Sequence, residues 1–481
     1  MSFFIHCQPT EYKDVCQKML SDLFHWVSRE EENRDYYLDI ALLENQIKGS
    51  LKAGDKCTLE SFAIDGFKKE NIRLIILRLV TKFFAWPERP WGTLLGLRPT
   101  KVVHRLIDQG WTDAAIITHL QRVYGLSLCK AELATAVARG ERRFFLAEQD
   151  LQKKIAVYVG IPFCPTRCLY CSFPSYALAG RSDVLKGFLQ ALEEEINHLA
   201  GVIREHELTV ESLYVGGGTP TTLGAAELDG LLGLLMEQFG SELAEFTVEA
   251  GRPDTIDRDK LQAMLKHRVS RLSINPQTMN DATLQLIGRK HSSQETVQAF
   301  KLAREMGFNN INMDLIIGLP GEKLADAAYT LDFMQQFSPE SITCHAMALK
   351  RASRLKEEQP DFSAADRGLV EEMMNLVEAK MSVMGLKPYY LYRQRDILAD
   401  LENVGYAVPG RESVYNVQMM EERQTVIGLG GGSVSKAVFL PDFKVKRIFN
   451  PKDPKTYIEK IAAIKRKKEE FINAWLTRNL E

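Results

Sequence analysis

Short apolar runs alternate with amphipathic helical stretches over the middle of the chain, from about residue 153 to residue 350. The apolar runs have the length of strands, and in order they are KKIAVYVGIPF (153–163), VESLYVGGGTP (210–220), EFTVEAGRPD (245–254), SRLSINPQT (270–278), NINMDLIIGLPGE (310–322) and ESITCHAMALK (340–350). Strands that alternate with helices at this spacing indicate βαβ units and a parallel sheet. Six such strands without a dinucleotide fingerprint favour an α/β fold with a partial (β/α)6 barrel of the TIM type, in which every strand ends at the same rim.

The same pattern divides the chain into three predicted domains. They are a mixed, mostly helical N-terminal domain without a catalytic motif (1–150), the barrel (151–390) and a short C-terminal extension (391–481). The extension ends in a basic helix in which Ile461, Ile464, Phe471 and Trp475 recur at helical spacing. We expect these four side chains to dock on the barrel while the lysines of the helix face water.

Composition and charge narrow the class of protein. The 481 residues are 45% hydrophobic and carry a formal net charge of −2, which is typical of a soluble globular protein and gives no overall attraction to nucleic acid or membranes. The N-terminus lacks the features of a signal peptide, and no stretch approaches the roughly 18 apolar residues of a membrane span. We therefore expect a cytoplasmic protein without a membrane span. Two basic segments, 68–130 and 444–468, support a nucleic-acid partner only weakly.

Eight cysteines are present, and their distribution points to a metal or redox site. Five are isolated, whereas Cys164, Cys168 and Cys171 lie close together directly after the first strand-like run. In a reducing compartment such a group suggests metal or redox chemistry before structural disulfides. Thiolates are the ligands of iron–sulfur clusters, and three of them leave one iron open to bind a further molecule. The alternatives are a partial zinc site or three unrelated thiols.

Glycine and polar residues follow the later strands, at the rim where a barrel carries its active site. Gly216, Gly217 and Gly218 let the backbone approach a ligand closely, although an ordinary βα turn has the same composition. The polar residues at the following strand ends, and in the loop LIGRKH, are Glu249, Gln277, Arg289 and Asp314. Such groups are typical of binding residues in a barrel, but each one alone is equally compatible with a structural role.

The spacing C-x3-C-x2-C, with Tyr170 before the third cysteine, resembles the motif of the radical S-adenosylmethionine (SAM) superfamily. The resemblance implies a 4Fe–4S cluster held by the three cysteines. It also implies that the open iron chelates the amino and carboxylate groups of SAM, which is cleaved to a 5′-deoxyadenosyl radical. The barrel is then expected to be a radical SAM barrel.

Over about residues 155–435 the chain resembles a narrower family, the oxygen-independent coproporphyrinogen III oxidases and their heme-chaperone relatives (HemN/HemW-like). The SAM contacts that this resemblance implies are Tyr158, Gly217, Gly218, Thr219, Glu249, Gln277, Arg289, Asp314, Ala348 and Val434. Some members place a second SAM with six of these residues, which are Gly218, Thr219, Gln277, Arg289, Asp314 and Ala348. One or two SAM molecules are therefore expected.

The chain departs from the family pattern around the cysteines and at both ends. Gly160 replaces the usual histidine, Phe173 stands where the oxidase has a further cysteine, and Ser172 stands where the chaperones tend to have an aspartate. A long N-terminal region precedes the barrel, and only 46 residues follow Ser435 where the family has a large C-terminal domain. This arrangement resembles the HemZ branch, the coproporphyrinogen dehydrogenase type. The departures concern the substrate contacts more than the cleavage of SAM.

The resemblance implies an oxidoreductase of heme biosynthesis that converts coproporphyrinogen III to protoporphyrinogen IX, with a flavodoxin or ferredoxin as electron donor. A tetrapyrrole that carries four propionates needs an apolar floor and several Arg or Lys groups. The candidate substrate residues, including a lid from the N-terminal domain, are Tyr389, Tyr390, Tyr392, Arg393, Arg395, Tyr406, Arg411, Tyr415, Arg89, Trp91, Arg98 and Lys101.

Three other functions stay open at this point. The first is a heme-binding chaperone of the same fold without oxidase turnover, and the second is a radical SAM enzyme that opens or methylates heme itself. The third is RNA modification, which rests on the two basic segments alone and has no RNA-binding module to support it.

Overall fold

The computed structural model describes residues 2–480 except for 25–34, 65, 96, 97, 179, 181, 349–365, 395 and 396. The chain forms two compact units. Unit 1 comprises Met1–Arg139 and Tyr392–Glu402, and unit 2 comprises Gly140–Leu391 and Asn403–Glu481. The segment Tyr392–Glu402 therefore belongs with the N-terminal part of the chain, although the sequence analysis assigned it to the C-terminal extension.

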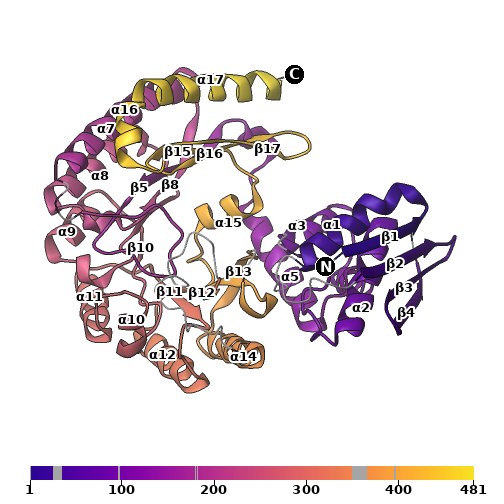
Figure 1. Ribbon diagram of the computed structural model, residues 1–481. Helices are drawn as coiled ribbons and strands as arrows, with labels where there is room; N and C mark the ends of the chain where they lie inside the picture. Colours follow the sequence, from indigo (N-terminus) through magenta and orange to yellow (C-terminus); the bar gives the residue numbers. More distant parts are fainter. Residues whose placement is uncertain are drawn as a thin grey trace. The chain divides into compact units, whose positions relative to one another are not determined.

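Unit 2 is built on a large sheet with a parallel centre (Figure 1). The six central strands are β5 (Lys154–Ile161), β8 (Thr209–Gly217), β9 (Glu245–Glu249), β10 (Arg271–Ser273), β11 (Ile311–Ile317) and β12 (Ser341–Ala346). They lie side by side in this order, and all of their pairings are parallel. These are the six strands predicted from the sequence, and the α/β fold class with a partial TIM-type barrel is confirmed.

Helices cover the outer side of the central strands (Figure 1). The connecting helices are α7 (Ser182–Glu205), α8 (Ala225–Phe239), α9 (Arg258–Lys266), α11 (Ser293–Glu305), α12 (Leu324–Phe337) and α14 (Arg367–Val383). Capping side chains fix the first turns of α9 and α11. The Asp257 carboxylate accepts from the Lys260 N–H at 2.9 Å, and Ser292 forms a capping box with Glu295.

Further strands extend both sides of the parallel centre. On one side β14 (Asn403–Ala407) pairs antiparallel with β12, and β13 (Lys387–Tyr392) lies beyond it. On the other side β15 (Val426–Gly430) pairs parallel with β5 and is followed by β16 (Val434–Phe439) and β17 (Lys444–Phe449). The strand that precedes the cysteines therefore has a neighbour on each side.

The C-terminal helices α16 (Pro454–Glu459) and α17 (Ile461–Leu480) lie along α7 (Figure 1). As predicted, Ile464 and Trp475 of α17 are buried, whereas Ile461 and Phe471 are only half-buried. The prediction that the lysines of this helix face water is wrong for Lys468. Its side chain is buried and forms an ion pair with another buried group.

Unit 1 contains a four-stranded sheet that the sequence analysis did not foresee. Its strands lie in the order β1 (Ser2–Gln8), β2 (Asp35–Leu42), β3 (Gln46–Ala53) and β4 (Lys56–Ala63), with β1 parallel to β2 and the other pairs antiparallel. Helices α1 (Lys13–Phe24) and α2 (Lys68–Phe84) pack on one face of this sheet and share one apolar core with it.

Helices complete unit 1 and surround a buried carboxylate. They are α3 (Pro99–Asp108), α4 (Asp113–Tyr124) and α5 (Leu128–Glu141), whose last residues belong to unit 2. Glu402 is fully buried. Its carboxylate accepts a hydrogen bond from the Trp91 indole at 2.6 Å and forms an ion pair with the Lys130 ammonium at 2.7 Å. These contacts fasten the segment Tyr392–Glu402 to α5 and to the turn that carries Trp91.

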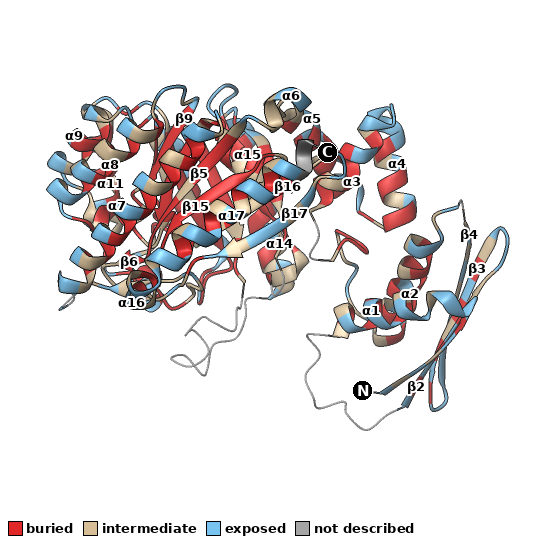
Figure 2. Cartoon of the chain, turned by 90° about the horizontal axis from the view of Figure 1, so that it is seen from above, coloured by how far each residue is buried: buried red, intermediate tan, exposed pale blue. Residues whose placement is uncertain are grey.

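The buried residues lie mainly in the strands and on the helix faces that pack on them (Figure 2). The strands β5 and β15 are almost wholly buried, and the exposed residues lie along the outward faces of the helices (Figure 2). In the part of the chain that the structure describes, no helix combines the length and the apolar character needed to cross a membrane.

The buried ion pair of unit 1 gives a stability prediction. Glu402→Gln removes the charge opposite Lys130 and leaves that ammonium group buried without its partner, so we expect the free energy of unfolding to fall by about 3 kcal/mol. Glu60→Gln, at the surface pair of Glu60 with Lys82, should change it by less than about 1 kcal/mol. Calorimetric unfolding of both variants measures the difference, and equal small losses would contradict the prediction.

Candidate active site

The three cysteines lie in a loop that follows β5 and is closed at its base. Strand β6 (Phe163–Cys164) pairs with β7 (Tyr176–Ala177), and the Tyr176 N–H donates to the Pro162 carbonyl at 2.9 Å. Within the loop, the Cys171 N–H donates to the Cys168 carbonyl at 3.2 Å and closes a tight turn. The loop therefore holds its three thiols on a short, locally bonded stretch of backbone.

The thiols are partly withdrawn from water. Burial raises the pKa of Cys164 to about 11, and burial likewise raises the pKa of Cys171. Among the described residues, the three sulfurs do not form a group in which all ligand atoms lie within 4.8 Å of one another, whereas the ligands of one tetrahedral zinc ion are about 3.8 Å apart. An iron–sulfur cluster spreads its thiolate ligands over several metal ions, so it suits this loop better than a single zinc ion.

The end of β8 lies directly against the first cysteine. The Cys164 sulfur is 3.5 Å from the Thr219 hydroxyl, and the Thr219 N–H donates to the Phe163 carbonyl at 2.7 Å. A β-carbon placed on Gly218 would collide with the backbone carbonyl of Phe163 and lie 2.9 Å from the Cys164 sulfur, so the backbone leaves no room for a side chain here. The structure thus brings the predicted residues Gly217, Gly218 and Thr219 to the cysteine loop.

Arg289 lies against the second cysteine. The segment that carries it packs on the loop, because the Leu169 N–H donates to the Ile287 carbonyl at 3.0 Å. Burial lowers the pKa of the Arg289 guanidinium, but its contacts with Tyr170 and Cys168 outweigh burial and raise the pKa overall. Its guanidinium also donates to the backbone carbonyls of Asn275 and Gly251, at the ends of β10 and β9. A permanent positive charge therefore lies between the strand ends and Cys168.

Glu249 ends β9 beside a stack of tyrosines. The Tyr214 hydroxyl donates to the Glu249 carboxylate at 2.6 Å. Tyr415 of α15 (Val414–Glu421) stacks on Tyr214 with ring centroids 4.5 Å apart, and Tyr158 stacks on both at 6.0 and 6.2 Å. Burial is the main cause that raises the pKa of Glu249 to about 7. This carboxyl therefore changes its charge near neutral pH.

Gln277 and Asp314 lie on neighbouring segments of the rim. The Gln277 N–H donates to the Asp314 carbonyl at 2.9 Å, and Gln277 has a positive φ of 69°, which is rare for a residue with a side chain. Burial would raise the pKa of Asp314, but hydrogen bonds from His345 and Asn312 outweigh burial and lower it. Asp314 is therefore an anion at neutral pH.

The last two predicted contacts lie at the two sides of the parallel centre. Ala348 follows β12, and Val434 is the first residue of β16. A β-carbon on Gly428 would lie 2.8 Å from the Val434 backbone, so Val434 is packed against β15. The described contacts do not link either residue to the cysteines.

Two groups at the site were missed by the sequence analysis. Arg252 donates to the Thr166 hydroxyl of the cysteine loop at 3.0 Å and makes two 2.9 Å hydrogen bonds to the Asp254 carboxylate. Tyr214 holds Glu249, as described above. The only signal in the sequence was their position, because Arg252 lies three residues after the end of β9 and Tyr214 lies within β8.

Part of the predicted substrate set is wrong. Arg393 is buried and its guanidinium donates to the carbonyls of Leu94, Leu401 and Asp400 within unit 1, so it is not available for a propionate. Trp91 is fully buried with its indole on Glu402, which excludes it from a mobile lid. Arg395 lies outside the described residues.

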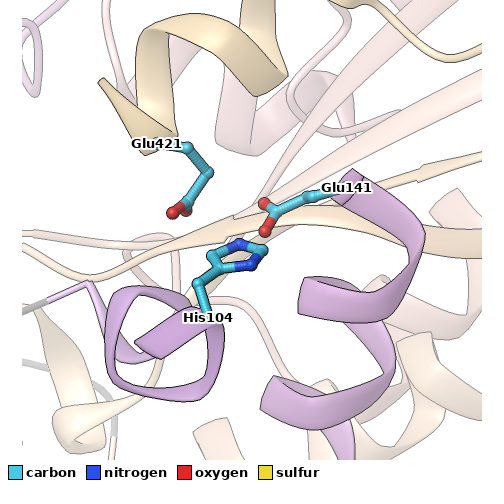
Figure 3. A group of neighbouring side chains, drawn as sticks. All are labelled: His104, Glu141 and Glu421. Carbon is cyan, nitrogen blue, oxygen red and sulfur yellow. The ribbon is translucent and has the colours of Figure 1, made fainter. Parts of the chain in front are cut away.

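A pair of buried carboxylates in unit 2 was also not predicted (Figure 3). Glu141 is the last residue of α5 and Glu421 is the last residue of α15, and each has a carboxylate oxygen within 4.8 Å of the other. Burial raises the pKa of Glu141 well above its usual value, and the charge of Glu421 adds to the effect. Glu141 therefore keeps its proton when Glu421 is ionised.

Comparison with known proteins places this geometry in a family. The model of the radical SAM superfamily matches residues 158–334. An oxygen-independent coproporphyrinogen-III oxidase-like protein HemZ of Bacillus subtilis is 40% identical over 397 residues, which cover 82% of this chain and 78% of that protein. The heme chaperone HemW of the same organism is 30% identical over 289 residues, which cover 58% of this chain and 70% of HemW.

A solved structure has the same fold. The coproporphyrinogen III oxidase HemN of Escherichia coli, a radical SAM enzyme, superimposes with a TM-score of 0.52 at 22% identity over 68% of this chain and 73% of HemN. Superfamily membership implies a 4Fe–4S cluster and SAM as cofactors. The chain belongs to the radical SAM superfamily and, within it, to the family of oxygen-independent coproporphyrinogen III oxidase-like proteins.

Proposed function

We propose that the chain is a radical SAM oxidoreductase that decarboxylates coproporphyrinogen III oxidatively to protoporphyrinogen IX. The observation that carries this proposal is the 40% identity to the HemZ-like protein over most of both chains. The cysteine loop supports it, because Cys164 and Cys168 each contact a predicted cofactor residue, Thr219 and Arg289.

The chemistry of the rim fits a 4Fe–4S cluster and SAM. Three thiols stand ready as ligands on one loop, and the carboxylates of Glu249 and Asp314 suit a cationic cofactor. The Gln277 side-chain oxygen and the Tyr415 hydroxyl are buried, and neither has a hydrogen-bond partner among the described residues. Buried polar atoms are normally paired in a folded protein, so these two atoms suit a polar ligand.

Arg289, Glu249 and the barrel walls each have a defined role in this proposal. A cluster held by Cys164, Cys168 and Cys171, with SAM bound at it, would supply the radical chemistry that removes a hydrogen atom from the β-carbon of a propionate. The propionate would then lose CO2 and pass one electron to an external one-electron acceptor, which leaves a vinyl group. Arg289 balances the negative charge of the thiolates, and Glu249 accepts hydrogen bonds from the cofactor. The barrel walls exclude water from the radical. A flavodoxin or ferredoxin is the proposed electron donor.

A second candidate function is favoured by one observation. The heme chaperone HemW of Bacillus subtilis is 30% identical to this chain over 70% of the length of HemW. A heme-binding role without oxidase turnover is therefore the alternative proposal.

The two functions differ in their product. Anaerobic incubation with coproporphyrinogen III, SAM and a reductant should give vinyl product if the chain is an oxidase. Stable stoichiometric heme binding without decarboxylation would support the chaperone instead.

Loss of one ligand should abolish the cluster. In Cys164→Ala we expect iron and sulfide content, the cluster absorbance and vinyl product to fall to background, because two thiolates cannot hold the cube against exchange. Cys57→Ala removes an exposed thiol of unit 1 and should leave all three unchanged. A Cys164→Ala protein that retains a full 4Fe–4S cluster would overturn the assignment of this ligand.

Close contact between β8 and the cysteine loop gives a second test. In Gly218→Ala the added methyl group collides with Cys164, so we expect SAM affinity to fall by about tenfold or more, since core overpacking typically costs 1–3 kcal/mol. Gly230→Ala in α8 has open space at its β-carbon and serves as the control. Equal SAM affinity in the two variants, measured by equilibrium dialysis, would contradict the proposed contact.

The pKa of Glu249 gives a pH dependence. Its carboxyl ionises near pH 7, and only the ionised form attracts cationic SAM, so SAM affinity should rise about tenfold from pH 6 to pH 8. The sign for stability is opposite. Because the folded pKa lies above the usual value of 4.5, the free energy of unfolding of the cofactor-free protein should fall as pH rises from about 4.5 through 7.

A matched variant separates the two effects. The pKa of Glu322 is also raised to about 7, mainly by burial, and its carboxylate likewise accepts from a hydroxyl, that of Thr278. Glu322 is not among the predicted SAM contacts, so it serves as the control. Glu249→Gln should flatten the pH dependence of SAM affinity, whereas Glu322→Gln should flatten only part of the pH dependence of stability. A SAM affinity that stays pH-dependent in Glu249→Gln would contradict the role of this carboxylate.

A further inference from the structure

Two charged residues occupy core positions of two packed helices in unit 2. Glu195 lies in the apolar face of α7, next to Ile196 and Leu199, and its exposed fraction is 0%. Lys468 lies in α17 between Ile464 and Ile472, and its exposed fraction is 2%. The Lys468 ammonium forms an ion pair with the Glu195 carboxylate. Burying two charges is costly even when they pair, so this pair invites an explanation beyond helix packing.

The Glu195 carboxylate receives four donors, and most of them lie outside the two helices. Its Oε2 atom accepts from the Gly430 N–H at 2.7 Å and from the Tyr457 hydroxyl at 2.6 Å. Its Oε1 atom accepts from the Asn450 amide at 3.1 Å and from Lys468. Every donor is buried, so the carboxylate is fully satisfied without water.

The other end of the pair reaches the same strand. Lys468 also donates to the Gly428 carbonyl. The Gly430 carbonyl in turn accepts from the Asn450 amide at 2.8 Å and from the Ser433 hydroxyl at 2.9 Å. The network therefore binds three backbone groups of β15, which are the Gly430 N–H and the carbonyls of Gly428 and Gly430. Residues 430–433, at the end of this strand, are called the glycine turn.

The glycine turn lies against both ends of the cysteine loop. A β-carbon on Gly431 would lie 2.7 Å from a ring carbon of Pro162, and one on Gly432 would lie 2.8 Å from a ring carbon of Pro174. Pro162 precedes Cys164, and Pro174 follows Cys171. Only a backbone without side chains fits this space, and a shift of the turn moves the surface on which the loop rests.

We propose that Lys468 and Glu195 are positioning residues for the cofactor site. They hold the backbone of residues 428–433, and through this turn they set the place of the cysteine loop and of Val434. The proposal rests on the proposed function only for the identity of the cofactor. The placement of the turn itself is independent of that function.

A neighbouring surface pair provides the matched control. Lys465 of α17 pairs with Glu194 of α7 at 2.9 Å, and both groups are partly exposed. It joins the same two helices one turn away but does not touch the glycine turn in the described contacts. A purely structural role in helix docking would be shared by the two pairs, whereas a role in positioning belongs to Glu195 and Lys468 alone.

The first experiment measures the turn directly in the full chain without cofactors. Hydrogen–deuterium exchange of the amides of residues 428–433 should be about tenfold faster in Glu195→Gln and Lys468→Met than in the parent protein. The first variant weakens the hydrogen bond from the Gly430 N–H to a charged acceptor, and the second removes the charged donor to the Gly428 carbonyl. Lys465→Met should exchange like the parent. Unchanged protection in both Glu195→Gln and Lys468→Met would overturn the proposal.

The second experiment measures SAM affinity by equilibrium dialysis after anaerobic cluster reconstitution. Lys468→Met should raise the dissociation constant about tenfold, an effect of the size of one lost charged hydrogen bond, whereas Lys465→Met should leave it unchanged. If the parent protein takes up no cluster, the proposed function fails, and the exchange experiment still decides whether the pair positions the turn.

A double variant separates positioning from stability. Glu195→Leu combined with Lys468→Met replaces the buried pair by apolar side chains, which often restores stability. It also removes the acceptor for the Gly430 N–H. Because the Gly430 N–H, the Tyr457 hydroxyl and the Asn450 amide lose an acceptor in this variant, we expect a melting temperature above that of Lys468→Met but below that of the parent protein, together with a SAM dissociation constant that stays raised about tenfold. Recovery of SAM affinity along with the melting temperature would overturn the proposal.

Discussion

The cysteine loop lies against bare backbone on two sides, and this close approach is the constraint on which the site depends. On one side Gly218 and Thr219 at the end of β8 contact Phe163 and Cys164. On the other side Gly431 and Gly432 leave no room for a side chain between the turn and the two prolines of the loop. Because both neighbours are strand ends of one hydrogen-bonded sheet, the place of the thiols follows from the register of β5 with β8 and β15.

The charges of the rim form a second constraint, because they are held with little access to water. Arg289 provides a fixed cation beside Cys168, and Asp314 provides an anion held by Asn312 and His345. Glu249 differs from both, because with a pKa of about 7 its protonated and ionised forms are both populated at neutral pH. The side-chain oxygen of Gln277 is buried and has no hydrogen-bond partner among the described residues, and the backbone of Gln277 has a positive φ of 69°. Strain and unsatisfied polar groups are tolerated where a ligand supplies the missing contacts.

The sequence was informative wherever function coincides with strand periodicity. Strand and helix periodicity predicted the six strands and their parallel order, and β8 and β9 carry Gly217 and Glu249 at their carboxyl ends as expected. Asp314, in contrast, lies in the middle of β11. Lys468 shows where this reasoning ends. A lysine within a basic helix reads as a solvated residue, and its partner lies 273 residues away. The sheet of unit 1 was missed although β2 and β3 alternate regularly between exposed and buried residues, and the pairing of β1 with β2 spans a helix.

The substrate contacts obey a different logic from the cofactor shell. Gly217 and Glu249 of the shell are the last residues of the paired strands β8 and β9, where the hydrogen-bond register determines their place. The arginines Arg393 and Arg411, proposed for the propionates, instead follow the strands β13 and β14. Arg393 illustrates the consequence, since its guanidinium is fully engaged by backbone carbonyls of unit 1. The chain is similar to both an oxidase-like protein and a heme chaperone, so the two proposed functions are told apart by what the segments that follow these strands bind.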